Sequence, residues 1–120
     1  MLKLVKKVEQ RHTIDVAEQQ VSFTLRPGSL GDMDIAYVSA LDEADRRQYA
    51  GTSRDNLFAL RAGRELLLQR ITAWEGVWLS ETEPAPCERE YLEEFFLQYP
   101  QAFQLLAQAV REQDEAAAKN

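Results

Sequence analysis

The chain has 120 residues, a hydrophobic content of 45%, one cysteine and a formal net charge of −6. This is the size of one ordinary domain, which can bury a core without disulfides or a structural metal. No apolar run has the length of a membrane span or a secretory signal, so we expect a soluble, cytoplasmic protein.

The acidic excess lies in the last third of the chain. Residues 1–80 balance at 11 basic and 11 acidic side chains, whereas residues 81–120 carry 3 basic and 9 acidic ones. Because affinity for nucleic acid depends largely on Lys and Arg contacts to phosphates, this distribution argues against a nucleic-acid partner.

Two short stretches near the N-terminus have the alternation of half-buried strands. Apolar and polar residues alternate over residues 12–16 and again over residues 21–25, which predicts a β-hairpin with residues 17–20 as its connection. A two-stranded ribbon is marginally stable alone. We therefore expect it to lie on helices, to pair with residues 5–10 as a third strand, or to pair with a second subunit, which would make a homo-oligomer.

The helical part is predicted to begin after Pro27. Apolar residues recur at helical spacing from about Asp32, with Asp32 or Ser29 as the cap, and this helix should break at Gly51. A long central helix is predicted from Arg54 to a stop at Gly76, capped by residues 52–55. Its apolar stripe comprises Leu57, Leu60, Leu67, Leu68, Ile71 and Trp74. We expect Leu60, Leu67 and Ile71 to be buried.

The pattern of the residues after Trp78 predicts a loop followed by two short helices. Proline-rich residues 80–86 read as the loop, and Cys87 and Glu90 occupy the positions of a capping box for the next helix. That helix should meet the last one at Tyr99 and Pro100. The predicted fold is α+β and mainly α: a short N-terminal β-hairpin followed by four to five helices around the central one. Residues 1–112 would form one domain, with a ribbon over 1–26, a helical part over 29–112 and a frayed tail over 113–120.

Catalytic and metal-binding patterns are weak. Cys87 at a helix start could pair with His12 as nucleophile and base, but nothing in the sequence brings them together. One His and one Cys cannot close a zinc site, no calcium-loop spacing is present, and no glycine-rich phosphate loop occurs. We expect a protein that is not an enzyme and that needs no metal or cofactor.

Five residues are candidates for binding a partner. Arg64 is predicted to project from the apolar stripe of the central helix, where it would either pair with a carboxylate or contact another chain. Trp78 lies past the predicted helix end, where an exposed aromatic suits an interface anchor. Tyr91, Phe95 and Tyr99 supply the outer aromatic surface of the following helix, although core packing is the usual role of such side chains.

The second half of the chain resembles the tail assembly chaperones of long non-contractile-tailed phages and prophages. The matching stretches are Ile-Thr-Ala-Trp-Glu-Gly-Val over residues 71–77 and Glu-Tyr-Leu-Glu-Glu-Phe-Phe-Leu-Gln-Tyr-Pro over residues 90–100. The match is good over residues 65–110. It departs from the family pattern in lacking a glycine after Trp78 and in having Cys87 where Ser or Thr is usual.

This resemblance implies a non-catalytic protein that binds the tape-measure protein and helps tail-tube subunits assemble around it. Such factors act in the host cytoplasm and are generally absent from the mature virion. Two other classes stay open at this point: a permanent structural protein of a phage tail or neck, and a small bacterial regulatory or antitoxin-like binding protein.

Overall fold

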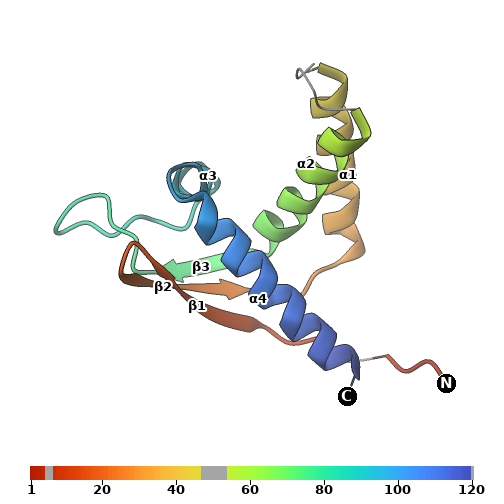
Figure 1. Cartoon of the computed structure of the whole chain (residues 1–120), viewed down its shortest axis with the longest axis horizontal. Coiled ribbons are helices and arrows are strands. Elements are labelled where there is room, and N and C mark those ends of the chain that lie inside the picture. Colours follow the sequence, from red (N-terminus) through yellow and green to blue (C-terminus); the bar gives the residue numbers. More distant parts are fainter. Residues whose placement is uncertain (5–6, 47–53, 120) are drawn as a thin grey trace. The chain divides into compact units, whose positions relative to one another are not determined.

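The computed structural model describes residues 1–4, 7–46 and 54–119. In chain order its elements are β1 (Gln10–Val16), β2 (Gln19–Leu25), α1 (Leu30–Arg46), α2 (Arg54–Arg70), β3 (Ile71–Glu75), α3 (Arg89–Gln98) and α4 (Pro100–Lys119) (Figure 1). The predicted class, α+β and mainly α with an N-terminal hairpin, is confirmed.

The chain forms two compact units. One, the sheet unit, comprises Met1–Pro27 and Ile71–Asn120, and the other, the helical pair, comprises Gly28–Arg70. The predicted division into a ribbon over 1–26 and one helical part over 29–112 is therefore different from the observed one. The last strand and the last two helices belong with the ribbon.

The predicted hairpin is present. β1 and β2 pair antiparallel with Ile14 opposite Val21 and His12 opposite Phe23. The two-residue connection, Ala17 and Glu18, has φ values of 49° and 66°. Positive φ at both central positions gives the turn a twist that matches the twist of the paired strands.

The third strand comes from a stretch that the sequence analysis placed in the central helix. β3 pairs antiparallel with β2, so the sheet order is β1-β2-β3. The helix thus ends at Arg70, and the prediction that it continues to Gly76 is wrong. The suggested third strand over residues 5–10 is wrong as well, because residues 7–9 have no regular structure and residues 5–6 lie outside the described part. The ribbon is completed within the chain.

A bulge in β3 explains why this strand has the spacing of a helix. Ile71 pairs with Leu25, and Ala73 pairs with Thr24. Thr72 is therefore an extra residue that has no paired residue on β2. An extra residue shifts the alternation of side chains by one. Ile71 and Trp74 are three residues apart, and both are buried. On a helical wheel this spacing imitates one face of a helix.

The inner face of the sheet packs against α3 and α4 through aromatic rings. Phe23 on β2 has no exposed surface. Its ring stacks on Phe96 at 5.8 Å and meets Trp74 and Phe95 edge-on or tilted at 6.2 and 6.1 Å. From α4, which crosses the sheet (Figure 1), Leu106 is also fully buried. This cluster fixes α3 beside the end of β3.

The last two helices meet where the sequence predicts, but their ends differ from the prediction. α3 ends at Gln98 and α4 begins at Pro100. The residue that caps α3 is Glu88, with no side-chain hydrogen bond, so the predicted capping box at Cys87 is wrong. Instead of fraying from residue 113, α4 continues to Lys119, and Asp114 accepts a hydrogen bond of 2.7 Å from Gln10 on β1.

The helical pair consists of α1 and α2. The predicted cap of α1 is confirmed: the Ser29 amide donates to the Asp32 carboxylate at 3.0 Å, and the Asp32 amide donates to the Ser29 hydroxyl at 3.2 Å. Leu67 is buried as expected, whereas Leu60, predicted to be in the core, is 70% exposed. The predicted break at Gly51 and the cap at residues 52–53 lie outside the described residues.

Candidate partner-binding hollow

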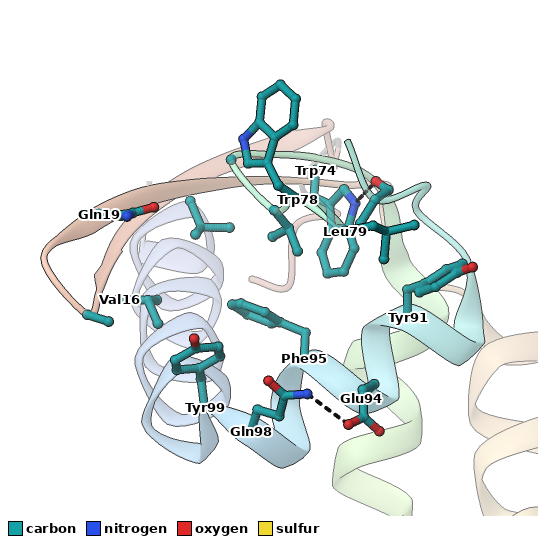
Figure 2. Close-up of a pocket in the computed structure, with 15 residues that line it drawn as sticks. Val16, Gln19, Trp74, Trp78, Leu79, Tyr91, Glu94, Phe95, Gln98 and Tyr99 are labelled. Carbon is teal, nitrogen blue, oxygen red and sulfur yellow. Dashed lines mark hydrogen bonds between the residues drawn. The ribbon is translucent and has the colours of Figure 1, made fainter. Parts of the chain in front are cut away.

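A hollow of about 310 Å³ opens in the sheet unit where the tip of the hairpin, the segment after β3 and α3 converge (Figure 2). We call it the aromatic hollow. The hairpin contributes Val16, Ala17, Gln19 and Val21. Residues 74–85 and 91–99 contribute Trp74, Gly76, Val77, Trp78, Leu79, Ala85, Tyr91, Glu94, Phe95, Gln98 and Tyr99.

The floor of the hollow is apolar. Val21, Trp74 and Phe95 are all buried, and the Trp74 and Phe95 rings meet edge-on at 5.6 Å. The one polar atom of the Trp74 ring, Nε1, donates a hydrogen bond of 2.8 Å to the Ala85 carbonyl (Figure 2). Because that donor is already satisfied, the floor offers carbon surface to a ligand and favours apolar groups.

Large apolar side chains stand around the rim. Trp78 is 57% exposed, Leu79 47% and Tyr99 37%. In Figure 2 the Trp78 ring projects outward from the loop, away from Phe95. Exposed apolar side chains gathered around an opening are typical of a binding site, whereas single scattered ones are not.

Backbone hydrogen bonds hold the loop that carries Trp78. The Leu79 amide donates to the Glu83 carbonyl at 2.8 Å, and the Ala85 amide donates to the Val77 carbonyl at 2.9 Å. Trp78 and Pro84 form an isolated antiparallel bridge. The loop is thus a small closed hairpin, and Trp78 is presented from a hydrogen-bonded backbone.

The surroundings of the hollow are acidic. Glu94 is part of the lining and accepts a hydrogen bond of 2.8 Å from Gln98. Glu81 and Glu83 are exposed on the loop, and Glu90 is exposed in the first turn of α3. The lining residues include no lysine or arginine. A partner with cations beside an apolar surface would suit this charge distribution.

Four of the five predicted partner-binding residues line this hollow. They are Trp78, Tyr91, Phe95 and Tyr99. The fifth, Arg64, is exposed on α2 in the helical pair and is not in the lining. Its predicted place amid an apolar stripe is wrong, because Ala62 and Leu68 are buried while Arg64 lies with Leu60 on the exposed side of the helix.

Sequence reasoning missed the contribution of the hairpin tip and the role of Trp74 as the floor. Both depend on β3, which brings Trp74 opposite Phe23 and places the end of the strand beside residues 16–21. The available signal was the β-branched and aromatic content of residues 71–74, which favours a strand over a helix.

The pairing of Cys87 with His12 gains no support. Burial raises the pKa of the Cys87 thiol, which is the opposite of what a nucleophilic cysteine needs. The His12 ring Nε2 lies 2.8 Å from Gln10 Oε1 within the same strand. Among the described residues no group of three or more His, Cys, Asp and Glu side chains is placed to hold a metal ion.

In the part of the chain that the structure describes, no helix combines the length and apolar content that crossing a membrane requires. Comparison with protein-family models, with curated proteins and with solved structures gives no match.

Proposed function

We propose that the protein is a non-catalytic phage tail assembly chaperone. It would bind helical segments of a tape-measure protein, keep them soluble in the host cytoplasm, assist the assembly of tail-tube subunits around them, and be absent from the mature virion. The observation that supports this best is the aromatic hollow. The two stretches that resemble the chaperone family, residues 71–77 and 90–100, contribute its floor and one of its walls.

The hollow suits the apolar face of an amphipathic helix. Such a helix presents large side chains at intervals of three and four residues, and grooves that receive it are apolar with a few polar groups at the edge. A volume of about 310 Å³ over a carbon-rich floor accommodates a few such side chains. Trp78, Leu79 and Tyr99 at the rim would then lie against the flanks of the helix.

The acidic surroundings add selectivity. Glu81, Glu83 and Glu94 would attract a helix that carries Lys or Arg beside its apolar stripe, and they would repel acidic chains. Complementary charges mainly increase the rate of encounter and exclude wrong partners, while burial of the apolar side chains supplies most of the affinity. A chaperone for an aggregation-prone helical protein needs both properties.

Co-expression with a tape-measure protein tests the proposal. The amount of tape-measure protein that stays in the soluble fraction is compared for the wild type, for Trp78→Ala and for Leu97→Ala. Leu97 is the matched control, because it is 74% exposed on α3 but does not line the hollow. We expect wild type and Leu97→Ala to hold the partner soluble to the same extent and Trp78→Ala to hold less.

Two results would count against the proposal at different levels. If the wild type keeps no more partner soluble than an unrelated acidic protein of equal size, the chaperone function is wrong. If Trp78→Ala performs as well as the wild type, the function stands and the hollow is not the binding site. Detection of the protein in purified virions would favour a permanent tail component instead.

A further inference from the structure

The N-terminal segment ahead of β1 exposes large apolar side chains beside lysines. Its exposed apolar residues are Met1, Leu2, Leu4 and Val8. The first three are fully exposed, and Lys3 and Lys7 are exposed among them. Residues 1–4 and 7–9 have no regular secondary structure. A row of exposed apolar side chains favours contact with another surface.

The order of these residues is that of a basic amphipathic helix. Met1, Leu4 and Val8 follow one another at intervals of three and four, so a helix would align them along one side. Lys3 and Lys7, four residues apart, would flank that side. A helix of eight residues is not stable in water without a partner, which agrees with the absence of regular structure. We therefore expect the segment to become helical when it is bound.

The aromatic hollow offers the surface that such a helix requires. Trp74 and Phe95 supply a floor of carbon surface, and the volume of about 310 Å³ admits a few aliphatic side chains. Glu94 is in the lining, Glu81 and Glu83 are exposed on the adjoining loop, and the lining includes no lysine or arginine. Lysines beside an apolar stripe complement both the floor and these acids.

We propose that the N-terminal segment of one copy, residues 1–8, binds as a short helix in the aromatic hollow of a second copy. Leu4 and Val8 would enter the hollow, and Lys3 and Lys7 would face the acids around it. The contact rests on the proposed function, because it assumes that the hollow binds helices. It adds regulation to that function, since a tape-measure helix must displace the segment before it can bind.

The position of β1 identifies a second copy as the source of the segment. The segment leaves the sheet at Gln10, whereas Val16, at the other end of the same strand, lines the hollow. The seven residues of β1 span roughly 20 Å, and a helix of eight residues is only about 12 Å long. The helix therefore cannot turn back to the hollow of its own chain. Two copies that exchange their segments would form a closed dimer.

Tryptophan fluorescence tests the contact directly. Both tryptophans of the chain line the hollow, Trp74 in its floor and Trp78 at its rim, and a synthetic peptide of residues 1–9 contains none. The receptor is the full-length Leu4→Asp variant, whose own segment should compete poorly for the hollow. We expect the peptide to move the emission maximum to shorter wavelengths along a saturable curve, because it covers the exposed Trp78 ring.

Matched variants of the peptide and the receptor show which features matter. A peptide with Leu4→Asp should bind at least about tenfold more weakly, because an apolar side chain is lost from the contact. A peptide with Lys3→Glu and Lys7→Glu should also bind more weakly, most clearly at low salt. By calorimetry, Trp78→Ala in the receptor should weaken binding. Leu97→Asp in the receptor, at a 74% exposed position outside the lining, should leave it unchanged.

Sedimentation equilibrium of the full chain tests self-association. We expect the mass of the wild type to rise above the monomer mass of 13.8 kDa at high micromolar concentration and Leu4→Asp to stay a monomer. Leu4 is fully exposed, so its replacement removes no packing in the folded chain. Far-UV circular dichroism checks that each variant is folded.

Three results would overturn the proposal: a peptide that leaves the fluorescence unchanged, a folded Trp78→Ala receptor that binds it as well as before, or a wild type that stays a monomer. A peptide that binds vesicles of anionic phospholipid but not the folded protein would assign the segment to a membrane surface instead. If a tape-measure helix binds the hollow and the peptide does not, the proposed function stands without this contact. If the peptide binds and the tape-measure protein is not kept soluble, the contact stands and the proposed function fails.

Discussion

Gly76 ends β3 with a φ of +98°, and a β-carbon at this position would meet the backbone carbonyl oxygen of Gln20. The sequence analysis assigned Gly76 a left-handed conformation at the end of a helix. The conformation is indeed left-handed, but it serves a strand that passes close to its neighbour. A residue with a side chain would be strained there and would also push two backbones apart.

We expect Gly76→Ala to lower the free energy of unfolding by about 2 kcal/mol or more, because both effects add. Urea denaturation followed by fluorescence measures the change. Gly28→Ala is the matched control: its φ is not in the left-handed region, and its β-carbon would make only ordinary contact with the Arg70 side chain at 3.6 Å. A loss equal to that of the control would mean that β3 does not end as described.

Cys87 provides a second test at the level of one residue. Because burial raises the pKa of its thiol, the reactive thiolate is scarcer at neutral pH than in an unhindered cysteine. Alkylation by iodoacetamide should be slower than that of a small free thiol at pH 7 and should increase with pH beyond the range where the free thiol has levelled off. Cys87→Ser should leave partner binding intact. Rapid alkylation at neutral pH would reopen a nucleophilic role.

Leu67 tests the packing of α2. It is buried, so Leu67→Ala should cost about 2–5 kcal/mol through lost apolar burial and the cavity that remains. Leu97→Ala at a 74% exposed position removes the same atoms and should cost less than about 0.5 kcal/mol. Reversible urea unfolding compares the two variants, and similar losses would mean that Leu67 is not in a packed core.

At the level of elements, the hairpin turn is where local conformation is strained. Ala17 and Glu18 both have positive φ, which asparagine and glycine adopt far more readily. Replacing the pair by Asn-Gly should raise the free energy of unfolding by about 1 kcal/mol. Ala17→Val, which puts a β-branched side chain in the same conformation, should lower it. If Asn-Gly destabilises the protein, the turn is not of this type.

The elements also show which features a sequence specifies locally. The β1–β2 hairpin, the Ser29 and Asp32 cap and the junction at Pro100 could be predicted because each depends on residues that are near neighbours in the chain. β3 could not, because the bulge at Thr72 gives Ile71 and Trp74 the three-residue spacing of a helix. The preference of these residues for a strand is resolved only by pairing with β2, about fifty residues earlier in the chain.

The candidate site was predictable to a similar extent. Its position past the predicted helix end and ahead of a polar loop singled out Trp78, and helical spacing grouped Tyr91, Phe95 and Tyr99. The tip of the hairpin was not predictable, because it reaches the hollow only through the sheet. Arg64 was placed wrongly for a related reason: with the helix extended to Gly76, its apolar stripe was drawn through Ile71 and Trp74, which belong to β3, and through Leu60, which is 70% exposed.

For the whole molecule, the distribution of charge predicts how partner binding depends on salt. The acidic excess of residues 81–120 has two locations. Glu81 and Glu83 lie beside Trp78, whereas Glu112, Asp114 and Glu115 lie toward the C-terminal end of α4. The two locations lie at opposite ends of β1, because Asp114 of α4 bonds Gln10 while the hollow includes Val16. Seven strand residues separate these ends by roughly 20 Å, about twice the screening length in ordinary buffer.

Only the acids near the hollow should therefore influence a bound cationic helix. We expect the affinity for a synthetic amphipathic helical peptide, with lysines beside its apolar stripe, to fall as salt rises from about 0.05 M to about 0.5 M. The double variant Glu81→Gln with Glu83→Gln should bind more weakly at low salt and show a flatter salt dependence. Glu112→Gln with Glu115→Gln changes the net charge equally but at the far end of α4, and should follow the wild-type curve. If both pairs flatten the curve alike, the peptide senses the overall charge of the protein and not the acidic edge of the aromatic hollow.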